Sequence, residues 1–253
     1  MKIKVLLALY AMIFLFCACS NLDTDSSSDR NPDETPLVAI KNLSCFENGK
    51  LILSWDYDYD SKGRVNHIYT MGAESYFNVA TITYEDGLVR LETDDEYEAS
   101  YRCDDDGRLE QMSSSPHNGN PGWVVEYDKS GYICSFTTLR DDPEKFDIIA
   151  SGGNYTFMGW NYIEYTDYPN KYSIDMNWMT MFLFGFELFD ETYALKFKNG
   201  YSKNLIKSIK TDETEKRVTY VFDDSSNVTD IKCQIFLLGE SNCLDEVNIK
   251  VGY

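Results

Sequence analysis

The chain has few of the residues that most enzyme sites require. It has two histidines, His67 and His117, and no Gly-x-Ser-x-Gly, His-Glu-x-x-His or Cys-x-x-Cys motif. A catalytic triad needs a nucleophile, a base and an orienting acid within hydrogen-bond reach, and no nucleophile motif accompanies either histidine. We therefore expect both histidines at the surface or at a strand edge, and we expect no catalytic set, no cofactor and no metal site.

Basic residues are also scarce. The chain has 23 Lys and Arg against 42 Asp and Glu, a net charge of −19, and removal of Lys2 and Lys4 with a signal peptide would make it −21. Nucleic-acid binding depends on basic side chains that neutralise phosphates, so this charge excludes that class of partner. Anionic lipid headgroups would repel the domain for the same reason.

The N-terminal apolar run is too short to span a bilayer. Residues 5–16 are all apolar or aromatic, whereas a spanning helix needs about 20 such residues. A short apolar core behind Lys2 and Lys4 is typical of a signal peptide. The sequence that follows, Cys17-Ala18-Cys19, resembles the bacterial lipobox, although Phe16 is a poor match to its usual Leu. We expect residues 1–18 to be removed and Cys19 to carry a lipid; the alternatives are an uncleaved anchor and an ordinary secretory cut.

Residues 19–37 have the composition of a flexible tether. They contain almost no large apolar side chain and cannot bury enough surface to offset the entropy of ordering. Their acidity resembles the tracts that send Bacteroidetes lipoproteins to the outer face of the outer membrane, and a merely polar linker is the alternative. We expect one domain over residues 38–253, since an all-β domain can reach about 200–250 residues.

Internal repetition is the strongest signal in the domain. One pattern recurs in the segments that begin at Tyr59, Cys103, Tyr127 and Phe222, with a shorter copy at Tyr84. It consists of an aromatic residue or Cys, then Asp, two polar residues, Gly or Ser, and two positions later an aliphatic residue. Asp at a turn entry can accept backbone hydrogen bonds, and a left-handed Gly at the exit closes a hairpin with a bulge. The pattern predicts hairpins with positive φ at Gly63, Gly107 and Gly131.

The expected fold is all-β: a curved antiparallel β-meander of repeated hairpins with one short buried helix. The helix is expected over residues 176–189, an apolar stretch without alternation that is too short for a membrane span. Four further strands are expected over residues 203–210, 215–222, 228–237 and 244–251. Five cysteines follow Cys19, an odd number, and we expect Cys45, Cys134 and Cys233 to be buried as small apolar side chains.

The repeats resemble the YD repeats of large bacterial surface proteins. The whole chain resembles a family of Bacteroidetes outer-membrane lipoproteins of uncharacterised function, with a lipobox, a tether and a domain of YD-like β-hairpin repeats. The segments that begin at Tyr165 and Ser202 also resemble that family. Cys103 and Ser226 depart from the repeat. The resemblance implies a fold and a location, and it carries no catalytic residues.

The lipid anchor, the tether, the hairpin-rich sheet and the lack of a catalytic set favour a binding function. We expect a lipid-anchored, cell-envelope binding or accessory module for a glycan or a protein, held to the membrane through Cys19. The alternative is an extracellular polymer hydrolase that uses two of the many carboxylates, which would have to face each other about 5–10 Å apart. Loops carry binding residues more often than strands. Trp123, Trp160 and Tyr162, beside Gly-rich segments, are therefore the candidate ligand-binding residues, with core packing as the competing explanation.

Overall fold

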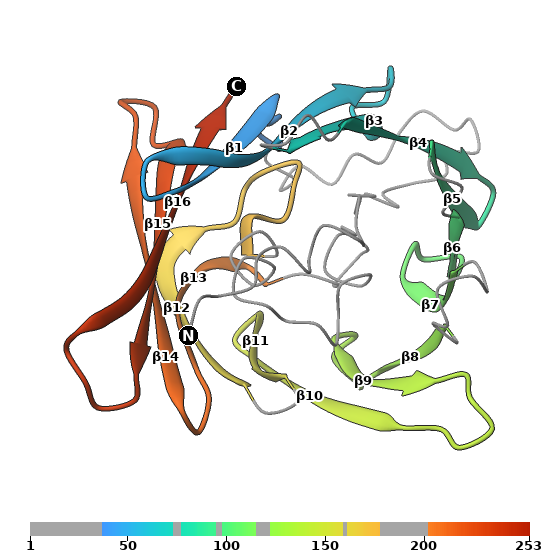
Figure 1. The fold of residues 1–253 in the computed structure, drawn as a ribbon. Helices are drawn as coiled ribbons and strands as arrows, with labels where there is room; N and C mark the ends of the chain where they lie inside the picture. The colour runs from blue at the N-terminus through green and yellow to red at the C-terminus, as the bar shows by residue number, and fades with distance from the viewer. Residues whose placement is uncertain (1–36, 73–76, 95–97, 115–121, 159–160, 178–201) are drawn as a thin grey trace.

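The computed structural model describes residues 37–72, 77–94, 98–114, 122–158, 161–177 and 202–253. These residues form sixteen β-strands in one sheet (Figure 1). The strands are β1 (Asn42–Glu47), β2 (Lys50–Tyr59), β3 (Val65–Gly72), β4 (Phe77–Glu85), β5 (Leu88–Thr93), β6 (Glu98–Cys103), β7 (Leu109–Ser114), β8 (Trp123–Tyr127), β9 (Ile133–Thr138), β10 (Lys145–Ser151), β11 (Asn154–Met158), β12 (Asn161–Pro169), β13 (Asn204–Lys210), β14 (Thr214–Phe222), β15 (Val228–Leu237) and β16 (Cys243–Gly252).

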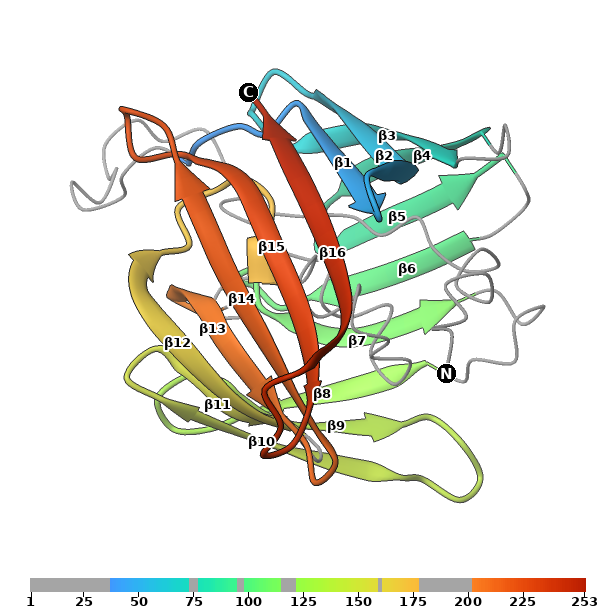
Figure 2. The ribbon, with the colours of Figure 1, turned by 60° about the vertical axis from the view of Figure 1, so that its left-hand side comes forward.

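The sheet is a closed antiparallel barrel in which each strand pairs with its neighbours in sequence, and β1 pairs with β16. Leu43 opposes Val251 and Cys45 opposes Ile249 across this closing pair. Figure 2 shows the long strands β13–β16 side by side along one part of the wall. The predicted all-β antiparallel meander is confirmed, and its closure into a barrel was not predicted.

The two faces of the wall differ in polarity. Strand side chains alternate between faces, and most inward side chains are apolar and buried, as at Leu43, Ile68, Leu91 and Ile231. Thr70, Asn78, Thr138 and Lys216 also lie on the inward face, since each is paired directly opposite an inward side chain. Along β2, Leu53, Trp55, Tyr57 and Tyr59 are buried or half-buried, while Leu51 lies beyond a β-bulge in the β1–β2 pair and is exposed. The hydrophobic core is therefore the inside of the barrel.

The repeat turns have the predicted geometry. Gly63, Gly107 and Gly131 have φ of 78°, 77° and 82°, and Ser226 takes the same place in the fourth turn with φ of 60°. Each of these four hairpins also carries a β-bulge just before the turn. At the second turn, Asp104 Oδ1 accepts hydrogen bonds from the N–H groups of Asp106 and Arg108. All four turns lie at the same end of the barrel, which we call the turn end.

Tyrosine hydroxyls connect successive hairpins at the turn end. Tyr84 Oη donates to the carbonyl of Val65 at 2.7 Å, and Tyr127 Oη donates to the carbonyl of Leu109 at 2.9 Å. In both cases an Arg of the earlier turn lies over the ring: the guanidinium carbon of Arg64 is 3.9 Å from the centre of the Tyr84 ring. The aromatic residue of the repeat thus fixes its hairpin against the one before it.

Residues 170–177 cross the turn end and help to close it. Tyr172, Ile174 and Met176 are buried. Ser173 Oγ lies 2.9 Å from Tyr59 Oη at the end of β2, while the Val228 N–H donates to Tyr172 Oη at 2.9 Å at the start of β15. The segment therefore bridges strands on different parts of the wall.

The predicted helix over residues 176–189 lies outside the described residues apart from Met176 and Asn177. Within the described part of the chain, no helix is long and apolar enough to cross a membrane. The four C-terminal strands are confirmed as β13–β16, each within one residue of its expected bounds.

Candidate functional site

The end of the barrel opposite the turn end, here called the loop end, carries the candidate residues. The β7–β8 and β11–β12 connections both lie there, because antiparallel strands return alternately to the two ends. Trp123 is the first residue of β8 and Tyr162 is the second residue of β12. The fold thus brings Trp123 and Tyr162 to the same end of the barrel but, as shown next, on opposite faces of the wall. Trp160 lies outside the described residues.

Trp123 faces the core. Its exposed fraction is 9%, and its ring packs against Phe136 and Phe146, with ring centres 6.5 Å and 5.5 Å away. Such aromatic pairs stabilise a core beyond the area they bury. In this structure Trp123 offers no open platform to a ligand.

Tyr162 faces outward and is one of the most exposed large apolar side chains, with an exposed fraction of 61%. It stands directly opposite Phe157 on β11, and Phe157 stands opposite Ile149 on β10. The Tyr162 and Phe157 ring centres are 5.1 Å apart at an interplanar angle of 56°, and Ile149 is 55% exposed. We call Ile149, Phe157 and Tyr162 the aromatic row, after the two rings of Phe157 and Tyr162.

Sequence reasoning identified Tyr162 but missed Phe157 and Ile149. The signal that could have found Phe157 is the short connection between β11 and β12, because residues that flank a tight hairpin turn face each other across the strands. Ile149 could not have been found that way, since a β-bulge between Ile149 and Ala150 shifts the β10–β11 register.

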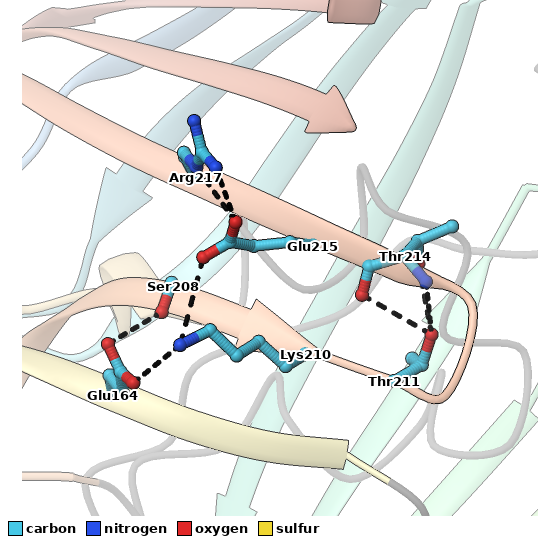
Figure 3. A network of polar contacts seen from close by, with 7 residues as sticks. All are labelled: Glu164, Ser208, Lys210, Thr211, Thr214, Glu215 and Arg217. Atoms are coloured by element: carbon cyan, nitrogen blue, oxygen red, sulfur yellow. Dashed lines mark hydrogen bonds and ion pairs between the residues drawn. The ribbon is translucent and has the colours of Figure 1, made fainter. Parts of the chain in front are cut away.

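Figure 3 shows a network of polar and charged side chains on β12, β13 and β14, the strand of Tyr162 and the two strands that follow it. Lys210, which opposes Tyr162, donates to Glu164 at 2.7 Å and lies 3.7 Å from Glu215. Glu215 also accepts from Arg217, and Ser208 Oγ donates to Glu164 at 3.1 Å. On the other side of the row, Glu126 accepts from Lys145 and Ser135, both at 2.6 Å.

Ion pairing favours the ionised form of Glu164 and Glu126. The hydrogen bond from Lys210 lowers the pKa of Glu164, and the one from Lys145 lowers the pKa of Glu126. A general acid in glycoside hydrolysis needs a raised pKa, so these two groups are suited to binding hydroxyls and cations rather than to donating a proton. Their lowered pKa values give the hydrolase alternative no support.

The remaining sequence candidates divide as follows. Cys45 and Cys233 are buried as expected, Cys134 is half-buried, and burial raises the pKa of the Cys45 thiol to about 12. His67 lies on β3 and stacks on Tyr69, while His117 lies outside the described residues. Within the residues that the structure describes, no group of three His, Cys, Asp or Glu side chains is placed to hold a metal ion.

Comparison with solved structures adds the class of fold. A porin-like protein from Bacteroides uniformis superimposes with a TM-score of 0.62 at 16% sequence identity, over 86% of this chain and 99% of that one. A porin-like protein from Bacteroides vulgatus matches with a TM-score of 0.48 at 10% identity, over 85% of this chain and 99% of that one. No protein-family model and no curated protein matches the sequence. The chain thus has a porin-like β-barrel fold, and at this identity the likeness concerns the fold alone.

Proposed function

We propose that this protein is a lipoprotein of the bacterial outer membrane, anchored through Cys19, whose barrel binds an extracellular glycan or protein without catalysis. The observation that carries the proposal is the polarity of the barrel wall. A membrane-spanning barrel has an apolar outer band and a polar interior. Here most inward side chains are apolar, as at Ile68 and Ile231, and ion pairs such as Glu164–Lys210 occupy the outside.

The same polarity argues against a conducting pore. A porin channel is lined with polar side chains in contact with water, while the inward side chains of this wall are buried and largely apolar. The crossing segment 170–177 further fills the turn end. A protein with this wall would reach the membrane through a lipid, which agrees with the lipobox-like sequence around Cys19.

The position of the first described residues determines which end of the barrel would face the membrane. Leu37 and Val38, the first described residues, lie at the turn end, where the Val38 N–H donates to the carbonyl of Lys171. A tether from Cys19 would therefore approach the turn end, with a flexible reach of roughly 20–25 Å. The loop end and the aromatic row near it would be free to meet a ligand.

Lipid labelling of intact bacteria tests the anchor. Wild-type protein is expected to incorporate a labelled fatty acid, and Cys19→Ala is expected to lose the label, with Cys17→Ala as the matched control that keeps it. Persistent labelling of Cys19→Ala would contradict the anchor. Protease treatment of whole cells then separates a surface location, where the protein is degraded, from a periplasmic one, where it is protected.

A further inference from the structure

We propose that the aromatic row of Ile149, Phe157 and Tyr162, on the outer wall of β10–β12, is a binding site for a neutral polysaccharide. This inference rests on the proposed binding function and names its ligand class and residues. The row crosses three adjacent strands in direct register, so its side chains form one continuous strip.

The strip combines exposure to solvent with contact between two aromatic rings. Ile149 and Tyr162 are 55% and 61% exposed, while Phe157 between them is half-buried, with its ring against that of Tyr162. Contiguous exposed apolar side chains on a water-facing protein commonly mark a binding surface. The C–H faces of a sugar ring are apolar, and they stack on aromatic rings such as those of Phe157 and Tyr162.

The charged side chains around the strip are suited to hydrogen bonds with the hydroxyl groups of a sugar. Lys210 opposes Tyr162 across the β12–β13 pair, and Glu164 lies two residues along β12 on the same outer face. Asp147 occupies the equivalent position two residues before Ile149 and is exposed. Carboxylates accept and ammonium groups donate hydrogen bonds, so sugar hydroxyls would find partners on both sides of the stacked ring.

Size and charge favour a glycan over the other candidate ligands. Three side chains fall far short of the roughly 800 Å² per partner that a stable protein interface buries. Around the strip, Lys145 and Lys210 pair with Glu126 and Glu164, Asp147 adds a further exposed carboxylate, and the whole chain has a net charge of −19. An anionic polysaccharide would be repelled, which leaves a neutral one.

Affinity electrophoresis of the full chain in mild detergent, through gels that contain neutral dextran, xylan or mannan or the anionic polymer polygalacturonate, tests this site. We expect retardation by at least one neutral polymer and none by polygalacturonate. Tyr162→Ala and Phe157→Ala should each weaken retardation roughly tenfold, the loss expected when one ring leaves a stacking platform. Phe77→Ala is the matched control, because Phe77 is 59% exposed on β4 elsewhere on the wall, and it should change retardation less than about twofold.

The results of this experiment test the proposed site and the proposed glycan binding separately. Retardation of the wild type by a neutral polymer that survives both Tyr162→Ala and Phe157→Ala would overturn the site while leaving glycan binding intact. No retardation of the wild type by any neutral polymer would overturn glycan binding itself. Retardation by polygalacturonate alone would contradict the charge argument and with it the proposed ligand. Circular dichroism of each variant checks that it has folded.

Discussion

Two aromatic residues near the loop end, Trp123 and Tyr162, show how differently the two faces of this barrel wall are built. Trp123 points inward and packs on Phe136 and Phe146, while Tyr162 points outward beside Lys210 and Glu164. In the sequence both are aromatic residues beside a Gly-rich segment, yet Trp123 belongs to the core and Tyr162 to the surface. The inward side chains of this porin-like fold are mostly apolar, whereas the interior of a membrane-spanning barrel is polar.

The largest effect is expected on the inner face. Trp123→Ala removes a buried ring from the core, and it should lower the free energy of unfolding by about 3–5 kcal/mol. Urea denaturation followed by circular dichroism measures the loss. A change below about 1 kcal/mol would mean that the ring contributes little to the core, and would return Trp123 to the list of binding residues.

A smaller effect is expected at the turn end, where the repeat turns join neighbouring strands. Asp104 accepts hydrogen bonds from the Asp106 and Arg108 N–H groups and from Arg108 Nε. Asp104→Ala should destabilise the protein by about 2–3 kcal/mol, since each lost bond costs roughly 1 kcal/mol.

Asp105→Ala is the control for that variant, because Asp105 is exposed in the same turn. It should change the free energy of unfolding by less than about 0.5 kcal/mol. Equal losses for Asp104→Ala and Asp105→Ala would show that net charge, and not the turn hydrogen bonds, sets the effect.

Acid should weaken the repeat turns specifically. Burial opposes ionisation of Asp60 and Asp104, but hydrogen bonds and charge from Arg64 and Arg108 outweigh it and lower the pKa of each carboxyl. A carboxyl whose pKa is lower in the folded state stabilises the fold above its unfolded pKa of about 3.9, and that contribution disappears as pH falls through the folded value.

Denaturation midpoints from pH 7 down to about pH 2.5 check this dependence. The stability gap between the wild type and an Asp60→Asn, Asp104→Asn double variant should stay constant down to about pH 4 and close below it. A gap that persists unchanged at the lowest pH would refute the role of these two carboxylates.

The smallest effect is expected on the outer face. Tyr162→Ala removes an exposed side chain and should change the free energy of unfolding by less than about 0.5 kcal/mol. Thermal unfolding of this variant beside Trp123→Ala gives the contrast directly. A loss near that of Trp123→Ala would place Tyr162 in the structural core and remove the basis for the aromatic row as a binding site.

How far the sequence predicts this molecule depends on how local each feature is. The turns at Gly63, Gly107 and Gly131 were predictable, because their hydrogen bonds join residues within five positions of one another. The pairing of β1 with β16 joins Asn42 to Gly252, and no local pattern encodes a contact so distant. Hence the strands and turns followed from the sequence, and closure of the barrel did not.

The candidate site was predictable to a lesser degree. The side chain of an aromatic residue near a loop can lie on the inner or the outer face of the wall, and a one-residue change of register moves it from one face to the other. The sequence therefore could not distinguish the buried Trp123 from the exposed Tyr162, and the β-bulge at Ile149 hid the third member of the row. Only the three-dimensional register brings Ile149, Phe157 and Tyr162 together.

The most direct test of this wall polarity is the behaviour of the chain without its lipid. A protein that begins at Ser20, produced without a signal peptide, should fold in buffer without detergent, give a β-rich circular dichroism spectrum and remain in the supernatant when neutral lipid vesicles are sedimented. Insertion into the vesicles with ion conductance, or a requirement for detergent to fold, would contradict a barrel with a mostly apolar interior and a charged outer face.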